Sequence, residues 1–161
     1  CLTWLAVAQA KFVGVNFLLS VLALVWTADI AAYFAGRAFG GRIIRRKLAA
    51  SISPGKSWEG VIGGMLGVML LAFAWRHVDQ INSVAVPSLY SCVADRGIWF
   101  LLAAVVFMAA MSVVGDLVES LVKRSAGAKD SSALLPGHGG VLDRVDALLP
   151  TLPLAMMLYS F

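Results

Sequence analysis

Charged residues are scarce in this sequence of 161 residues, of which 14% are charged and 60% hydrophobic. Soluble domains carry roughly a quarter charged residues. Cysteine and histidine are also rare, with two of each. The two cysteines have no spacing typical of a disulfide framework or a metal site, and one histidine near other polar residues is too little for zinc. The composition therefore predicts a membrane protein and gives no support to a disulfide scaffold or a zinc site.

The hydrophobic residues form long blocks and not short amphipathic stretches. A membrane-spanning helix needs about 20 residues. The first and third blocks are long enough, the second needs flanking residues or a thinner bilayer, and the fourth suffices only if it begins near Asp143. The four blocks are residues 12–34, 61–75, 98–122 and 147–161.

These blocks predict an all-α fold, a polytopic transmembrane helix bundle with about four to five membrane helices. Residues 1–10 fit the tail of an earlier apolar segment. The sequence does not begin with methionine and has no basic leader with a cleavage site. We therefore expect residues 1–161 to be a single transmembrane catalytic domain, the C-terminal part of a longer protein whose N-terminal helices are missing here.

Basic residues concentrate in two polar loops, residues 36–60 and 123–146. By the positive-inside rule both loops face the cytoplasm, and residues 77–97 lie on the opposite face. The net charge of +4 follows from this topology and from attraction to anionic headgroups. No interleaving of aromatic and basic residues indicates nucleic acid. We expect an integral protein of the bacterial inner membrane, and the sequence leaves open whether it forms a homodimer.

Three carboxylates lie inside the predicted apolar helices, where a charged side chain costs roughly 2.5–3.5 kcal/mol and needs a partner or a polar cavity. One helical face carries the spaced residues Asp116, Glu119, Ser120 and Lys123. The first helix repeats this pattern with Asp29, Tyr33 and Arg37. These residues either line a polar site or form ordinary intrahelical pairs at the membrane boundary.

The loop "SLVKRSAGAKDSSALLPGHGGVLDRVD", residues 120–146, has the residue types of a phosphate site. Its first half carries Lys123, Arg124 and Lys129. Its second half has Gly137, Gly139 and Gly140, whose missing Cβ atoms let backbone amides approach an anion. His138 either belongs to this site or only shapes the turn.

Two carboxylates one turn apart, Asp143 and Asp146, follow the glycines. Carboxylate oxygens of this kind hold magnesium beside a phosphate. The sequence therefore predicts a phosphate and Mg²⁺ site at this loop.

The other loop contains "SISPGKSWEG", in which Gly-Lys-Ser suggests a P-loop. Ala50 stands where the P-loop needs a glycine, and no strand precedes it, so this interpretation fails. Ser53, Lys56 and Ser57 remain candidates for contacts with phosphate or headgroups. Alternatively, Ser57 caps a helix and Lys56 lies at the lipid surface.

Taken together, the ordered elements Lys-Arg, Lys-Asp, Pro-Gly-His-Gly-Gly and Leu-Asp-Arg-x-Asp between Ser120 and Asp146 resemble the signature of the phosphatidate cytidylyltransferases, or CDP-diacylglycerol synthases. "WTADIAAYFAGRAFG" and "ISPGKSWEGVIGG" are similar to two upstream blocks of that family. The resemblance covers most of residues 25–150. Gly55 replaces a common lysine, and Ala147 a usual serine, which removes any role for a hydroxyl at position 147.

The resemblance implies that CTP and phosphatidate, a membrane lipid, give CDP-diacylglycerol and pyrophosphate with Mg²⁺. It implies Asp116 and Asp143 as first metal ligands, with Asp146 and Glu119 as further ligands. The implied phosphate contacts are Lys123, Arg124 and Lys129. His138, Gly139 and Gly140 would shape the nucleotide phosphate site, and Arg144 would neutralise pyrophosphate. Ser53, Lys56 and Ser57 would complete the pocket.

Two other functions stay open. A related CTP-dependent enzyme could act on another lipid, as a polyprenol kinase or an ether-lipid cytidylyltransferase does. A transporter fragment would also contain intramembrane acids and glycine-rich breaks, but its acids should be spread across the membrane. Here they gather at one face.

Overall fold

All elements of the computed structural model are helices, and it describes residues 2–41, 48, 53, 55–127 and 146–160. The predicted all-α membrane fold is confirmed. The helices in these ranges are α1 (Leu2–Val13), α2 (Val15–Phe39), α3 (Trp58–Asn82), α4 (Leu89–Ala94), α5 (Ile98–Ser125) and α6 (Leu148–Ser160).

Three of the described helices are long and apolar enough to cross a membrane, namely α2, α3 and α5, with 25, 25 and 28 residues. The predicted fourth segment does form a helix, but the 13 residues of α6 fall short of a full span. The 12 residues of α1 do so too. The three long helices thus form the membrane framework, with two shorter apolar helices beside it.

The helix at the second predicted block, residues 61–75, extends beyond this block at both ends. Ser57 caps the start of α3, because its Oγ accepts a hydrogen bond from the Gly60 amide at 3.1 Å. The helix continues to Asn82 and ends where Ser83 adopts a left-handed conformation with φ 46°. The segment expected to lie outside the membrane, residues 77–97, therefore includes the last turns of α3 and all of the short helix α4.

Helices α2 and α3 cross closely because small residues meet at their contact. A Cβ on Gly60 would lie 2.9 Å from the Ala32 carbonyl oxygen, and one on Gly64 would lie 2.9 Å from that of Ala28. Small residues four apart allow such an approach of two helix backbones in a membrane. The approach brings the middle of α2 next to the start of α3.

A buried polar cluster fixes the other end of these helices. Asp79 on α3 accepts hydrogen bonds from Asn16 Nδ2 at 3.1 Å and from Ser91 Oγ at 2.7 Å. Trp75 Nε1 donates to Asn16 Oδ1 at 3.1 Å, and the Ser88 amide donates to Asp79 Oδ2 at 3.1 Å. Asp79 therefore accepts hydrogen bonds from several donors, and these bonds hold α2, α3 and α4 together.

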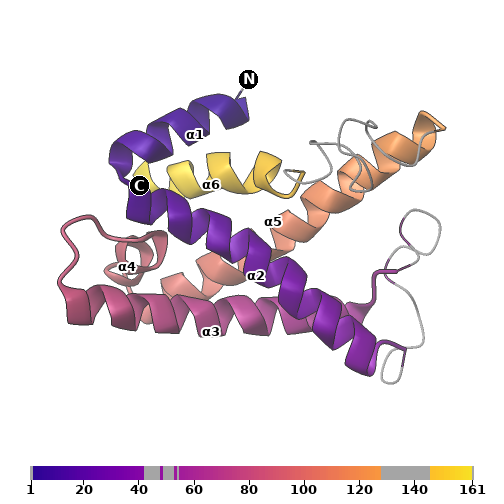
Figure 1. Cartoon of the computed structure of the whole chain (residues 1–161), viewed down its shortest axis with the longest axis horizontal. Helices are drawn as coiled ribbons and strands as arrows, with labels where there is room; N and C mark the ends of the chain where they lie inside the picture. Colours follow the sequence, from indigo (N-terminus) through magenta and orange to yellow (C-terminus); the bar gives the residue numbers. More distant parts are fainter. Residues whose placement is uncertain (1, 42–47, 49–52, 54, 128–145, 161) are drawn as a thin grey trace.

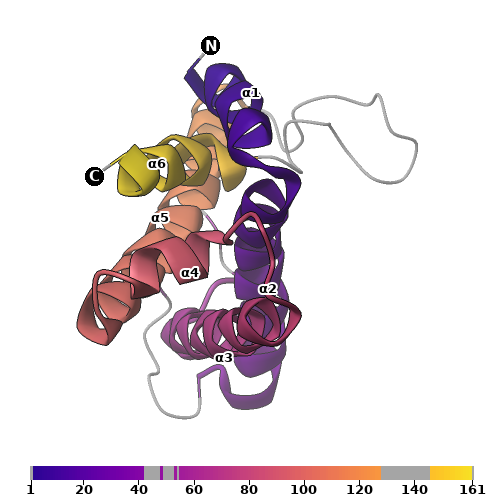
Figure 2. The same ribbon diagram turned by 90° about the vertical axis from the view of Figure 1, so that its left-hand side faces the viewer.

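The ends of the long helices determine where a site can form. α2 ends, α3 begins and α5 ends at the same end of the bundle (Figure 1). In both ribbon views α1 and α6 lie side by side on one flank, and α3 lies on the other, with α2 and α5 between them (Figure 2). The two basic loops thus follow helix ends that lie on the same side of the molecule.

Candidate active site

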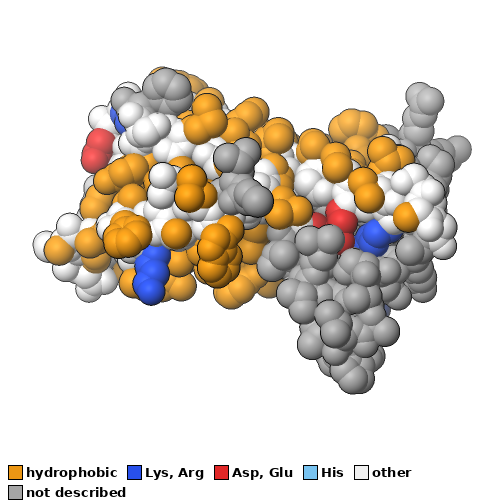
Figure 3. All heavy atoms as spheres, turned by 90° about the horizontal axis from the view of Figure 1, so that it is seen from above, with side chains coloured by type: hydrophobic (Ala, Val, Ile, Leu, Met, Phe, Trp, Pro, Cys, Tyr) orange, Lys and Arg blue, Asp and Glu red, His pale blue; other side chains and the backbone are white. Residues whose placement is uncertain are grey.

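A cavity of about 430 Å³ lies between α2, the start of α3 and α5. Figure 3 shows charged side chains of both signs beside one another near this end of the bundle, on a face that is otherwise largely hydrophobic. The polar and charged residues among those that line the cavity are Asp29, Tyr33, Arg37, Lys56, Ser57 and Asp116.

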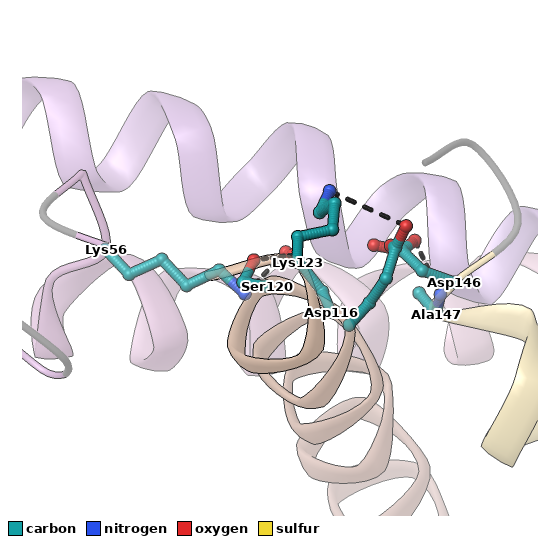
Figure 4. A network of polar contacts seen from close by, with 7 residues as sticks. Lys56, Asp116, Ser120, Lys123, Asp146 and Ala147 are labelled. Atoms are coloured by element: carbon teal, nitrogen blue, oxygen red, sulfur yellow. Dashed lines mark hydrogen bonds and ion pairs between the residues drawn. The ribbon is translucent and has the colours of Figure 1, made fainter. Parts of the chain in front are cut away.

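Two of the residues that line the cavity form an ion pair, through Lys56 Nζ and Asp116 Oδ2. Lys56 comes from the turn before α3, where its amide donates to the Ser53 carbonyl at 3.2 Å and its carbonyl accepts from the Leu48 amide at 3.3 Å. Figure 4 shows its side chain reaching from this turn toward Asp116 on α5. The structure thus places Lys56 at the cavity, and Ser57 is both a helix cap and a lining residue.

Helix α2 contributes Asp29, which the sequence analysis considered as part of a polar site but gave no catalytic or metal-binding role. Asp29 lines the cavity and interacts electrostatically with Asp116, Asp146 and Lys56. Tyr33 lies about one turn after Asp29, and Arg37 about two turns after it. Arg37 donates from Nη1 to the Tyr33 hydroxyl at 2.9 Å. The spacing of these three residues on an apolar helix was the available signal, but without knowledge of the crossing angle it could not show which neighbour they face.

Helix α5 carries two intrahelical pairs, which the sequence analysis gave as one of two alternatives. Ser120 Oγ donates to Asp116 Oδ1 at 3.4 Å, and Lys123 Nζ lies 3.5 Å from Glu119 Oε1. Glu119 is buried, whereas Arg124 is exposed at the end of the helix. Asp116 therefore takes part both in an intrahelical contact and in the bridge to Lys56.

Close packing brings the start of α6 to the same place. A Cβ on Gly115 would lie 3.0 Å from the Asp146 carbonyl oxygen and 2.8 Å from Pro150 Cγ. Asp146 Oδ1 accepts from the Ala147 amide at 2.6 Å, directly before α6 begins. Figure 4 shows Asp146 beside the α5 residues of the network. The glycine before Asp116 thus lets Asp146 approach α5.

Glu59 is a second acid that the sequence analysis did not use. It is buried in the first turn of α3, where it accepts a hydrogen bond from the Gly41 amide at 3.1 Å. A carboxylate in this turn also interacts favourably with the positive end of the helix dipole. Glu59 therefore ties the end of α2 to the start of α3, next to the cavity.

Six of the fourteen predicted site residues lie outside the described residues, and their roles stay predictions. They are Lys129, His138, Gly139, Gly140, Asp143 and Arg144. Within the described part of the chain, no three Asp, Glu, His or Cys side chains lie close enough to share a metal ion. The predicted metal ligands Asp116, Asp146 and Glu119 are all near this end of α5, and the magnesium prediction remains open.

The fold and the cavity define a polytopic membrane protein with a charged cavity at one end of its helix bundle. The chain belongs to the cytidylyltransferase family, whose sequence profile matches residues 1–161. The family resemblance read from the sequence is confirmed.

Several relatives carry a more specific name. The chain is 49% identical over 148 residues to a phosphatidate cytidylyltransferase of Haemophilus influenzae, covering 92% of this chain and 47% of that protein. It is 46% identical to one from Pseudomonas aeruginosa, covering 86% and 45%. It is 41% identical to one from Thermotoga maritima, covering 92% and 50%. The chain spans about half the length of these relatives.

Proposed function

We propose that this chain carries the active site of an integral membrane enzyme that makes CDP-diacylglycerol and pyrophosphate from CTP and phosphatidate. A phosphate oxygen of phosphatidate would form a bond to the α-phosphorus of CTP, and the bond from that phosphorus to the β-phosphate oxygen would break. The names of the relatives support this reaction, because they are phosphatidate cytidylyltransferases at 36–49% identity. A transporter has no such support.

The observation that carries the proposal is the cavity in which Lys56 pairs with Asp116 at the end of three apolar helices. Phosphates need cationic partners, and a lipid substrate needs a polar cavity that it can enter while its acyl chains stay in the bilayer. Lys56 and Arg37 supply positive charge on the described side of this cavity. Lys123, Arg124, Lys129 and Arg144 would add to it.

Catalysis here rests on positioning and charge neutralisation. The nucleophile is a phosphate monoester whose second pKa is about 6, so it is already largely dianionic at neutral pH and needs no strong base. Two substrates with this much negative charge repel each other. Lysine and arginine side chains that contact both phosphates reduce this repulsion and align the attacking oxygen with the bond that breaks.

We also propose Mg²⁺ as the cofactor, with Asp116 and Asp143 as first ligands and Asp146 and Glu119 as further ones. The described residues fit such an ion, because the Asp116 carboxylate lines the cavity and already binds a cation, the Lys56 ammonium. Magnesium is commonly held by one or two carboxylates together with substrate phosphates, so a full set of protein ligands is not required. When bound, the ion would neutralise charge on the phosphates.

The proposed location is the bacterial inner membrane, with the cavity on the cytoplasmic side where CTP is available. The basic residues of the two loops support this orientation. The remaining candidate residues, Ser53, Ser57, His138, Gly139 and Gly140, would contact the nucleotide phosphates from both loops.

The test is incorporation of label from radioactive CTP into lipid by the purified full-length protein in phospholipid nanodiscs. We expect CDP-diacylglycerol when phosphatidate is present and no labelled product with a polyprenol or an ether lipid. CMP transfer to the ether lipid from CTP labelled in the α-phosphate would assign the chain to a related cytidylyltransferase. Phosphate transfer to the polyprenol from CTP labelled in the γ-phosphate would assign it to a kinase. Transfer to none of them would overturn the proposal.

Asp116→Asn should reduce turnover by about 100-fold or more, because a neutral amide is a poor replacement for a charged metal ligand and for the partner of Lys56. The measurement is the rate of CDP-diacylglycerol formation at saturating CTP, with membrane insertion checked by detergent extraction. Asp95→Asn is the matched control, since Asp95 is exposed beside α4 at the other end of the bundle. Equal rates for the two variants would contradict a role for Asp116.

A further inference from the structure

The ammonium of Lys56 occupies one of the two carboxylate oxygens that Asp116 could offer a metal ion. The two side chains are 22% and 34% exposed, so this contact is only partly screened by water. The other carboxylate oxygen of Asp116 accepts the long hydrogen bond from Ser120 at 3.4 Å. A divalent ion that approaches Asp116 therefore competes with the ammonium of Lys56 for Oδ2.

Lys56 also balances more than one carboxylate. Asp29 interacts electrostatically with Asp116 and Asp146, which repel its charge, and with Lys56, which attracts it. Among the described residues that line the cavity, Arg37 is the other cation, and it is exposed and donates to Tyr33. Without Lys56, the repulsion of Asp29 by Asp116 and Asp146 would be less compensated, and this end of the cavity would attract a divalent cation more strongly.

A nucleotide changes this competition. Its phosphates offer Lys56 several negatively charged oxygens, and a lysine ammonium is a mobile donor on a flexible stem. The backbone of Lys56 is fixed by hydrogen bonds to Ser53 and Leu48, so only the side chain has to move. Once the ammonium contacts a phosphate, the Asp116 carboxylate is available to a cation.

We propose that Lys56 is an internal counter-ion that holds Asp116 until a nucleotide phosphate takes the ammonium away, so that the site binds its divalent cation together with the nucleotide and not before it. This inference rests on the proposed function. It assigns Lys56 a positioning role in addition to its contact with substrate.

The experiment measures Mn²⁺ affinity of the purified full-length protein by electron paramagnetic resonance, with and without α,β-methylene-CTP, which cannot transfer CMP. In the wild type we expect weak binding of Mn²⁺ alone and about 10-fold tighter binding with the analogue, a usual size for coupling between two ligands. Lys56→Met should bind Mn²⁺ alone about 10-fold more tightly than the wild type and should lose most of the effect of the analogue.

Two further variants separate direct competition from general electrostatics. Lys56→Arg keeps a cation at Asp116 and should bind Mn²⁺ alone as weakly as the wild type. Lys11→Met removes the same charge from the exposed last turn of α1, which does not line the cavity, and should give a much smaller gain than Lys56→Met. Equal gains in the two methionine variants would overturn the inference, because the effect would then be a property of net charge.

Phosphatidate could also supply the phosphate that takes Lys56, so the titration is repeated in nanodiscs with phosphatidate and no nucleotide. Tightening of Mn²⁺ by phosphatidate and not by the analogue would overturn the assignment to the nucleotide. Equal Mn²⁺ affinity of the wild type with and without the analogue would also overturn it, even if Lys56→Met does not fold. Failure of the proposed function has a different signature, which is absence of CMP transfer by the wild type.

Discussion

Asp29 is an acid on an apolar helix that the structure turns toward the cavity. It lines the same space as Lys56 and Asp116 and interacts with both charges. A carboxylate inside an apolar segment is costly unless it has a partner, and here the partner lies on a different element. Asp29 therefore belongs to the charge balance of the site, although it lies within α2 and not in the basic loop that follows this helix.

We expect Asp29→Asn to lower the rate of CMP transfer by about 10- to 100-fold, the range seen when a group that supports metal ligands is lost. The asparagine keeps the shape of the side chain and removes its charge, so Lys56 would be held more firmly by Asp116 alone. The measurement is turnover with varied Mg²⁺, and the requirement for Mg²⁺ should rise. Turnover and Mg²⁺ dependence like those of the wild type would show that Asp29 is only a lining residue.

At the scale of elements, the crossing of α2 and α3 sets the site geometry. Asp29 follows Ala28, whose carbonyl oxygen lies against Gly64, and Ser57 and Lys56 directly precede α3. The charged groups therefore keep their distances only if the two backbones stay in close contact. The glycines carry no charge, yet they determine where the charges of the cavity lie.

Gly64→Val should destabilise the protein by about 1–3 kcal/mol, because the new side chain would meet the backbone carbonyl of Ala28, which cannot move aside cheaply. The measurement is thermal unfolding in detergent, together with CMP transfer. Gly55→Val is the matched control for stability, since a Cβ at Gly55 meets no atom of the described structure within 4 Å. Identical unfolding temperatures for the two variants would mean that the close contact of α2 with α3 at Gly64 does not contribute to the stability of the protein.

For the whole molecule, the proposal requires both polar loops on one side of the membrane. With Cys1 and Cys92 replaced by serine, single cysteines at Arg46 and Ser125 should react only with a cytoplasmic thiol reagent. A cysteine at Asn82, the last residue of α3, should react only from the opposite side. If positions 46 and 125 label from different sides, the two loops cannot form one site and the mechanism fails.

The sequence predicted the fold class and the three long helices well, because apolar runs of this length have few alternatives in a membrane. It predicted the ends of α3 poorly. Hydropathy falls before Arg76, but Asp79 is satisfied by hydrogen bonds from α2 and α4, so the helix continues beyond the apolar run. Such partners are distant in sequence and leave no periodic signal.

The same limit applies to the site. Spacing along α5 offered the pairs of Asp116 with Ser120 and of Glu119 with Lys123 as one of two alternatives, and the structure contains both of these local contacts. It could not predict that Lys56 would reach Asp116, or that Asp29 would share their cavity, because these contacts depend on how the helices cross. The roles of residues 128–145 in the second polar loop stay predictions, because these positions lie outside the described residues.

The contact of α2 with α3 through glycine and alanine also bears on how the protein responds to temperature. Two helices that already lie in lipid withdraw little apolar surface from water when they pair, so their attraction comes from dispersion between closely packed backbones. Burial of apolar surface from water is what gives folding its large heat-capacity change. Pairing of this hairpin should therefore have a heat-capacity change near zero, and cooling should not weaken it as cooling weakens the core of a soluble protein.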